Sequence, residues 1–364
     1  MRRYYPGITI FKLVGCLLVL FAHLVINRYM VSLPNHQLRF ISLPLGVIVT
    51  CFYVVAGFLA YKGWTNASDS HHYIKRYVNR ILMMYVPFCL LFMFEFIAPE
   101  LFRGGFSFAN LGLQAKILTA AVILNGPSVQ LWFIPPLIFS LCVCYWLVEK
   151  RGVRFALLAG MIGFLMSLLI SGSLRSLMVD HLESYLSGGS ILVYIKLFVY
   201  RYLGLGFTFV LIGVLLARYE EEFNRAKVWP ILGAALVVSA LEFVYLWRYI
   251  EWNMEYKITL SIIPNTILVF YGILRVKSQI IQKYHSFINL FSIVTFCGHI
   301  LFMRLNLLLL NWEITELSNL QNIVYVASTG IECILVSIVL YKWKSIFSSM
   351  TFNRFKRMSR STER

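Results

Sequence analysis

The chain has 364 residues, of which 59% are hydrophobic, 16% aromatic and only 13% charged, and its mean hydropathy is +0.74. A soluble globular chain carries about twice that charged fraction, so the composition excludes a soluble protein and predicts a polytopic membrane protein. The net charge of +17 does not indicate nucleic-acid binding, because the basic residues concentrate in loops between apolar runs. The seven cysteines lie mostly inside apolar runs without a CxxC pair, so we expect neither disulfides nor a metal site.

The first apolar stretch, residues 7–29, has the length of one membrane crossing but contains Lys12 and His23. Their separation of eleven residues at about 100° each amounts to three helical turns plus ~20°, so both side chains share one helix face, about 16 Å apart along the axis. A charge in the hydrocarbon layer costs at least ~2.5 kcal/mol unless it faces protein or water. The shared face therefore favours a functional polar cavity over a snorkelling lysine and an interfacial histidine with structural roles. A signal peptide is the alternative for this stretch, but no small-residue cleavage site follows.

Apolar runs of about twenty residues predict an all-α integral membrane protein with ten membrane-spanning helices. Their approximate ranges are 8–27, 41–61, 81–99, 130–148, 154–172, 193–216, 228–247, 258–275, 286–310 and 321–341. Residues 104–128 are apolar but contain Gly, Asn and Pro, so we expect a re-entrant or interfacial piece there rather than a full crossing. No repeat or linker divides the chain, which predicts one membrane domain over residues 1–344 and a basic cytoplasmic tail over residues 345–364.

The distribution of basic residues predicts the orientation of the chain. With the amino terminus in the cytoplasm, 22 of the 33 basic residues fall in cytoplasmic segments and only seven in outer ones. Both termini are therefore expected in the cytoplasm. Counting residues 104–128 as a crossing would place the basic loop at Lys150 outside, so the charge pattern argues against it.

A basic stretch with Lys75, Arg76 and Arg80 follows the second span. If this stretch is helical, Arg76 and Arg80 are i, i+4 neighbours that face one way just below the membrane. Two guanidinium groups there could hold phosphates by forked hydrogen bonds. The alternative, which the spacing alone favours, is that they are topology charges that bind lipid headgroups.

Further polar and aromatic residues occur in or beside the later spans. Trp132 and Phe133 at a span end are ordinary for an aromatic belt. Ser292 and His299 are seven residues apart and share a helix face, but about 10.5 Å of axial rise is too far for a direct Ser–His bond. Glu242 and Glu332 are intramembrane carboxylates and therefore functional candidates, with Arg201 or His299 as expected partners.

Several stretches of the chain occur together, and in order, in one known family. They are Lys12-x10-His23, FYVVAGFLA, YIKRYVNRIL, QLWFIPP, FTFVLIGVLLAR and FSIVTFCGH. In combination they resemble the membrane acyltransferase 3 family, whose polytopic enzymes O-acetylate bacterial surface carbohydrates, and the resemblance covers nearly the whole chain. It implies a ten-helix domain in the cell (inner or plasma) membrane that takes an acyl group from acyl-CoA at the cytoplasmic face. The acyl group then passes to a hydroxyl of a glycan, usually on the outer side.

The resemblance also implies roles for single residues. Lys12 stands where the family has Arg or Lys, and His23 matches its essential histidine. Trp132 and Phe133 match a tryptophan–phenylalanine pair, and Ser292 and His299 fit the pattern of the late helix. The chain departs from the family at the basic stretch, which commonly reads Arg-x-x-Arg but here has Tyr77 three residues before Arg80. It also has Pro6-Gly7 in place of the usual Arg-Gly before the first helix.

We therefore predict a membrane O-acyltransferase, with O-acetyl transfer as the expected reaction. His23 is expected to be the general base that takes the proton of the acceptor hydroxyl, since a neutral imidazole with an ordinary pKa of about 6.5 suits that role. Lys12 is expected to orient the acyl donor electrostatically. Lys75, Arg76 and Arg80 are the predicted donor-binding residues. The predicted acceptor pocket consists of Trp132, Phe133, Ser292, His299 and Arg201.

The expected partners are acyl-CoA (acetyl-CoA above all) as co-substrate, a saccharide or lipid-linked glycan as acceptor, and membrane lipids. No bound cofactor, metal or nucleic acid is expected. A transporter or flippase for a saccharide or lipid-linked precursor is the main alternative, because ten spans with buried charges suit it equally well. A weaker alternative is a non-catalytic partner of a polysaccharide synthase.

Overall fold

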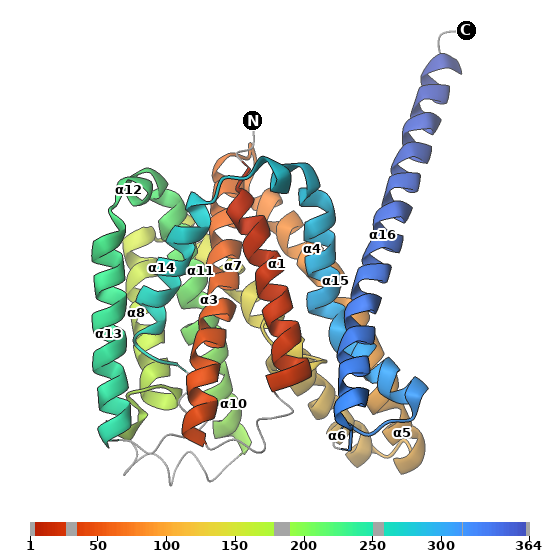
Figure 1. The fold of residues 1–364 in the computed structure, drawn as a ribbon, viewed down its shortest axis with the longest axis horizontal. Coiled ribbons are helices and arrows are strands. Elements are labelled where there is room, and N and C mark those ends of the chain that lie inside the picture. Colours follow the sequence, from red (N-terminus) through yellow and green to blue (C-terminus); the bar gives the residue numbers. More distant parts are fainter. Residues whose placement is uncertain (1–3, 27–34, 178–189, 250–257, 315, 362–364) are drawn as a thin grey trace. The chain divides into compact units, whose positions relative to one another are not determined.

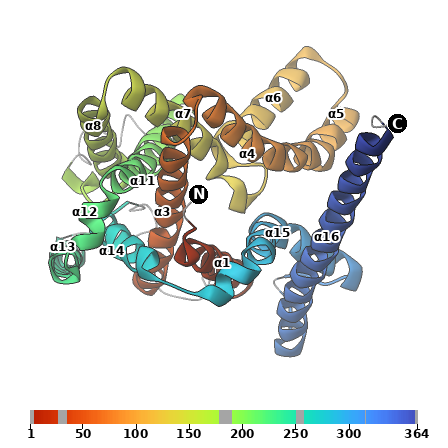
Figure 2. The same cartoon turned by 90° about the horizontal axis from the view of Figure 1, so that it is seen from above.

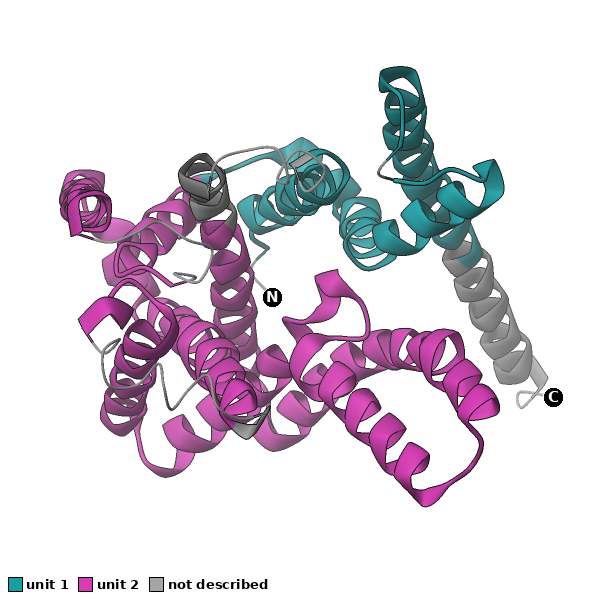
Figure 3. Ribbon diagram, turned by 90° about the horizontal axis from the view of Figure 1, so that it is seen from below, with its two compact units in different colours: residues 1–32, 276–364 teal, residues 33–275 magenta. Residues whose placement is uncertain are grey.

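The computed structural model describes residues 4–26, 35–177, 190–249, 258–314 and 316–361, with the backbone alone for residues 26, 35–45, 190–191 and 344–361. The chain is 88% helical, and the described part contains no strand, only one isolated bridge between Gly172 and Ile258. The predicted all-α fold is thereby confirmed. Two compact units are formed, one from residues 1–32 and 276–364 and the other from residues 33–275 (Figure 3). Each unit is considered by itself.

The first unit consists of the first helix and the last two long helices. Its elements are α1 (Pro6–Phe21), the π-helical turn η1 (Ala22–Ile26), α15 (Gln279–Leu310) and α16 (Asn319–Ser361). Helix α15 packs against both α1 and α16. Leu20, Leu24, Met303, Leu317 and Tyr325 form a buried apolar cluster that joins these elements. Helix α16 continues through the predicted domain boundary after residue 344 to Ser361.

The second unit contains the remaining helices (Figures 1 and 2). They are α3 (Asn35–Thr65), α4 (Ser70–Phe92), η2 (Met93–Ile97), α5 (Ala98–Gly104), α6 (Phe108–Thr119), η3 (Ala120–Asn125), η4 (Val129–Leu131), α7 (Ile134–Lys150), α8 (Val153–Ser171), η5 (Arg175–Leu177), α10 (Ser190–Phe198), η6 (Val199–Phe207), α11 (Thr208–Arg218), α12 (Glu220–Arg225), α13 (Val228–Tyr249) and α14 (Ile262–Arg275). Helices α3 and α11 form the most extensive packing within this unit.

Two glycines bring the backbones of α3 and α11 into direct contact. A Cβ atom added at Gly57 would lie 3.0 Å or less from three backbone atoms of Val210. A Cβ atom at Gly213 would lie 2.8 Å from the Phe58 nitrogen and closer still to the Val54 carbonyl oxygen. Small residues permit such close approach between membrane helices, where lipid removes the hydrophobic drive for association. The stretches FYVVAGFLA and FTFVLIGVLLAR, which carry these glycines, therefore have a packing role.

Ten helical segments of the described chain are long and apolar enough to cross a membrane, by length and composition, which confirms the predicted number. The set of ten differs at two places. Residues 108–125 form one helical run of the required length, whereas the apolar helix Ile262–Arg275, where a span over 258–275 was predicted, is shorter. The run over 108–125 is continuous because Gly104 and Gly105 end the preceding helix, with φ of 72° at Gly105, and do not interrupt this one.

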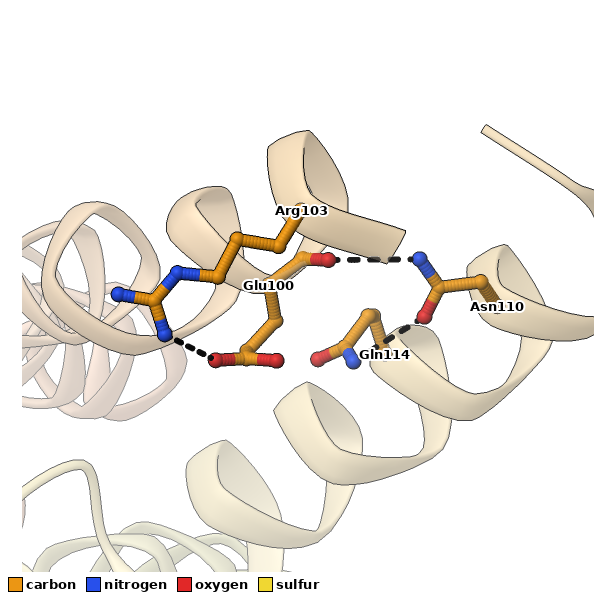
Figure 4. A network of polar contacts seen from close by, with 4 residues as sticks. All are labelled: Glu100, Arg103, Asn110 and Gln114. Carbon is orange, nitrogen blue, oxygen red and sulfur yellow. Dashed lines mark hydrogen bonds and ion pairs between the residues drawn. The ribbon is translucent and has the colours of Figure 1, made fainter. Parts of the chain in front are cut away.

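Polar side chains fix the corner between α5 and α6 (Figure 4). Asn110 Nδ2 donates to the Gly105 oxygen at 2.8 Å and to the Glu100 oxygen at 3.4 Å, and Gln114 Nε2 donates to Asn110 Oδ1 at 3.3 Å. Glu100 also pairs with Arg103 at 3.3 Å. The Gly and Asn residues that we interpreted as interruptions of an apolar run are thus the turn between two helices.

Side chains of neighbouring helices satisfy carbonyl groups at the far end of the 108–125 run. The carbonyl oxygens of Val122, Ile123 and Leu124 in η3 accept hydrogen bonds from the hydroxyls of Tyr85 (2.6 Å) and Tyr202 and from Nη1 of Arg201, respectively. Tyr85 and Tyr202 lie in the middle of the candidate spans 70–104 and 192–218. A helix that ends at membrane depth must have its last carbonyls satisfied by protein, as they are here. The re-entrant or interfacial nature of this segment stays a prediction, because the run is also long enough to cross.

The basic connections of the second unit gather at one end of it. Lys62 Nζ lies 2.7 Å from Glu220 Oε2, which joins the end of α3 to α12. Ser70 at the start of α4 lies 2.9 Å from the Tyr145 hydroxyl near the end of α7. Arg275 at the end of α14 donates to the Asn224 oxygen at 3.0 Å. The segments predicted to be cytoplasmic therefore share one end of this unit, while the side of the membrane stays a prediction.

Candidate functional site

His23 lies on the packed face of the first helix. The buried residues of α1 and η1 recur at three- and four-residue intervals, at Ile8, Phe11, Cys16, Leu20 and Leu24. Lys12 and His23, both half-buried, occupy positions beside this stripe, whereas Val14 and Phe21 on the other face are about half exposed. The π-helical turn begins only one residue before His23, so α-helical rotation holds for nearly the whole interval. The predicted common face of Lys12 and His23 agrees with this burial pattern.

His299 on α15 lies directly beside His23. The centroids of the two imidazole rings are 5.2 Å apart and the ring planes are inclined by 37°. His299 is completely buried. Its Nδ1 lies 2.8 Å from the Thr295 oxygen and 3.1 Å from the Phe296 oxygen, so the backbone of its own helix holds the ring. Two histidines 276 positions apart in the sequence therefore form one pair.

The buried face of α15 carries a stripe of polar residues. Ser292 and His299 are both on it, as their seven-residue spacing predicts, and Ser292 donates to the Ile288 oxygen at 2.8 Å. Sequence reasoning missed two further members, Thr295 and Asn306. Both are polar residues in an apolar run and both follow Ser292 or His299 at helical spacing, which is the signal that could have identified them.

Lys12 has no ion-pair or hydrogen-bond partner within the described part of the chain. A cation without a carboxylate in a membrane helix is costly unless a ligand, water or another charge compensates it. A lysine that binds an anionic ligand must have no carboxylate partner of its own, and Lys12 meets this requirement among the described residues.

Arg201, Trp132 and Phe133 meet in the second unit. The Arg201 guanidinium carbon lies 5.1 Å from the centroid of the Trp132 ring, and Nη1 also lies 3.3 Å from Asn125 Oδ1. Phe133 accepts a hydrogen bond from the Tyr53 hydroxyl through its carbonyl oxygen at 3.1 Å. Because Arg201 also caps the carbonyl end of η3, it has a structural role whether or not it contacts a substrate. The QLWFIPP stretch and Arg201 thus form one aromatic and cationic cluster.

The predicted donor-binding residues lie together on one exposed face of α4. Lys75, Arg76 and Arg80 are exposed, whereas Ile74 and Val78 on the opposite face are buried. Their charged groups have no acidic partner among the described residues, and Arg80 contacts only its own helix, by a 3.4 Å bond to the Arg76 oxygen and a stacking contact with Tyr77. The i, i+4 relation of the two arginines is confirmed, and the resulting patch is free to bind anions.

The two intramembrane carboxylates have different partners from those predicted. Glu242 accepts from the backbone nitrogens of Leu260 (2.5 Å) and Ser261 (2.8 Å), and Glu332 accepts from Asn306 Nδ2 at 3.1 Å. Within each unit, the described contacts include none between Glu242 and Arg201 or between Glu332 and His299. Backbone and amide N–H donors satisfy these carboxylates, so they have structural roles in the described contacts. The described residues contain no group of three His, Cys, Asp or Glu side chains that could hold a metal ion.

A family model described as an acyltransferase domain matches residues 5–342 of the chain, which is nearly its whole length. Comparison with curated proteins and with solved structures finds no match.

Proposed function

The chain belongs to the membrane acyltransferase 3 family, and from this premise we propose that it transfers an acyl group, acetyl in the first instance, from acyl-CoA to a hydroxyl of a cell-surface or exported saccharide. The observation that carries the proposal is His23 of η1, on the packed face of the first helix that also bears Lys12. His23 is proposed as the general base, and Lys12 as the cation that orients the donor or stabilises developing negative charge.

The proposed reaction is an attack of the acceptor hydroxyl oxygen on the thioester carbon. His23 takes the hydroxyl proton as the new C–O bond forms, the C–S bond breaks, and the proton finally passes to the thiolate of CoA. A preliminary transfer of the acyl group to His23 itself is a variant of this mechanism. Both variants require a ring nitrogen of His23 that is free of hydrogen when the reaction begins.

The acyl donor is proposed to bind on the basic face of α4. CoA carries several phosphates, and guanidinium groups bind phosphate through paired hydrogen bonds. The exposure of Arg76 and Arg80 and their lack of acidic partners among the described residues support this assignment. The acceptor saccharide is proposed to contact the cluster of Arg201 and Trp132, because aromatic rings and hydrogen-bond donors suit a sugar.

The general-base proposal is tested by His23→Gln. Glutamine can hydrogen-bond with similar reach but cannot take a proton at neutral pH, so the variant should lose about 10²–10⁴ in the rate of acyl transfer by purified protein. His23→Ala should fail equally, and both should unfold at the wild-type temperature. His285→Gln on α15 is the matched control, since His285 is exposed and contacts Tyr4 rather than His23. Substantial transfer by folded His23→Gln would refute the general-base role, and absence of any acyl transfer by wild-type protein would favour a transporter.

The donor site is tested by Arg80→Ala. Loss of one charge-assisted hydrogen bond costs about 1.5–3 kcal/mol, so the KM for acyl-CoA should rise tenfold or more while acceptor affinity is unchanged. Arg103→Ala is the matched control, because Arg103 is an exposed arginine at the other end of the same helical run and pairs with Glu100. If neither Arg76→Ala nor Arg80→Ala changes donor affinity, these residues are topology charges alone.

A further inference from the structure

The hydrogen bonds of His299 define which of its ring nitrogens carries hydrogen. Nδ1 faces two backbone carbonyl oxygens, of Thr295 at 2.8 Å and Phe296 at 3.1 Å. A carbonyl oxygen can only accept, so Nδ1 is the donor. In a neutral imidazole the other nitrogen then has a lone pair and no hydrogen. The backbone of α15 thus holds His299 in the form whose Nε2 is a hydrogen-bond acceptor.

The Nε2 atom of His299 is buried and has no hydrogen-bond partner among the described residues. Leaving a buried polar atom unpaired is costly, and native structures rarely do so without a reason. The Thr295 hydroxyl oxygen, one helical turn earlier, is also buried and unpaired within the described part of the chain. The α15 face next to His23 therefore contains polar capacity that the fold does not use.

We propose that His299 is the positioning residue of the general base, and that its Nε2 accepts a hydrogen bond from the ring N–H of His23. The inference rests on the proposed function. The structure brings the two ring centroids to 5.2 Å without forming this bond, and the inference draws on that proximity and on the unused acceptor character of Nε2. When one ring nitrogen of His23 donates to His299, the other ring nitrogen of neutral His23 has no hydrogen. It can therefore take the proton of the saccharide hydroxyl.

During the proposed reaction His299 neither gains nor loses a proton. The proton of the saccharide hydroxyl moves to His23. The positive charge on His23 is then stabilised by the Nε2 lone pair of His299. The same proton finally passes from His23 to the thiolate of CoA. An orienting carboxylate does this in the Ser-His-Asp triad. A neutral imidazole avoids burying a second charge, which is costly in an apolar surrounding. A neutral imidazole therefore suits a membrane helix better than a carboxylate would. The described contacts of His299 include no acidic neighbour.

The test compares three substitutions at His299 by acyl-transfer kinetics. His299→Phe keeps a ring and removes both nitrogens, and His299→Asn keeps a donor for the Thr295 oxygen but provides no atom at the Nε2 position. Both should lower kcat about 10- to 100-fold, the loss of one hydrogen bond to a charged group, and leave the KM for acyl-CoA within about twofold. His299→Gln can bring its amide oxygen to the Nε2 position and should retain more activity than either. His285→Phe is the matched control and should behave as wild type.

The tautomers are measured directly by nitrogen NMR of wild-type protein labelled with ¹⁵N-histidine, assigned by loss of each signal in the variants. We expect His299 to carry hydrogen on Nδ1 alone, and His23 to have one tautomer in the wild type but a mixture in His299→Phe. Hydrogen on Nε2 of His299, or wild-type kcat in folded His299→Phe, would overturn the inference. If His23→Gln is inactive while His299→Phe is fully active, only the positioning role fails. If His23→Gln is itself active, the proposed general base fails.

Discussion

The contact between α3 and α11 predicts that replacing glycine by alanine destabilises the protein at this contact but not at other helix positions. Gly57→Ala and Gly213→Ala each add one methyl group where the partner helix leaves no space. The new Cβ at Gly213 would lie 2.8 Å from the Phe58 nitrogen and 2.9 Å from the Val54 carbonyl carbon. Ordinary van der Waals contacts are about 3.5–4.0 Å, so the two backbones must separate by roughly 1 Å.

The magnitude follows from two opposing contributions. Overpacking costs about 1–3 kcal/mol, and replacing glycine by alanine within a helix returns about 0.5–1 kcal/mol. The difference is a net destabilisation of up to about 2.5 kcal/mol at either site, which lowers the unfolding temperature by a few degrees. The double variant should cost less than the sum of the two single variants, because helices that have already separated accommodate the second methyl group more easily.

The matched controls are Gly233→Ala in α13 and Gly272→Ala in α14. An added Cβ at either position has no heavy atom of another described element within 4 Å, so only the gain in helix propensity remains. Thermal unfolding of purified protein in one detergent should rank both controls at or above wild type and both contact variants below it. Equal shifts at Gly213 and Gly233 would refute the direct backbone contact.

Three further predictions concern orientation, donor binding and one ion pair. Cysteines introduced at Ser68 and Asn319 should react with an impermeant thiol reagent from opposite sides of the membrane, and equal labelling of both from outside would contradict the predicted orientation. Lys12→Arg should retain part of the acyl-transfer rate while Lys12→Ala should not, since the role is electrostatic; equal losses in the two variants would argue for a shape requirement instead. Lys62→Ala should destabilise the fold by about 1–2 kcal/mol, less than a fully buried pair because Lys62 is 32% exposed, and Glu220→Gln in the same chain should recover part of the loss in a denaturation experiment. No recovery would show that the ion pair itself is not what the lysine contributes.

The features that depend on one helix could be predicted from the sequence. Helical rotation relates Lys12 to His23, Arg76 to Arg80, and Ser292 to His299 without reference to any other element, and each relation holds in the structure. The contact of His23 with His299 could not be predicted, because it depends on which face of α15 packs against α1. Sequence spacing contains no information on that pairing.

Other differences arise because one residue type serves two structural purposes. Glycine and asparagine interrupt apolar runs in some proteins and form turns between two helices in others. The sequence therefore favoured a re-entrant or interfacial piece over residues 104–128, whereas the structure has a turn followed by a helical run of crossing length. The predicted partner of Glu242 was wrong for a different reason. Backbone N–H groups at Leu260 and Ser261 satisfy this carboxylate, and backbone donors are present at every residue whatever its side chain. A search for cations in the sequence cannot find them.

The carbonyl end of η3 has a consequence for how the protein enters the membrane during synthesis. Three of its last four carbonyls accept from side chains distant in sequence. Tyr85 is 37 residues from Val122, and Arg201 and Tyr202 are 77 and 79 residues from Leu124 and Ile123. The ribosome therefore releases η3 well before two of its three donors exist. Because unsatisfied carbonyls are costly in lipid, we expect the segment 108–125 to reach its final position only after residues 199–207 follow. Completion of this region is thus a late event in biogenesis, and a chain truncated before Arg201 would leave the end of η3 without two of its hydrogen bonds.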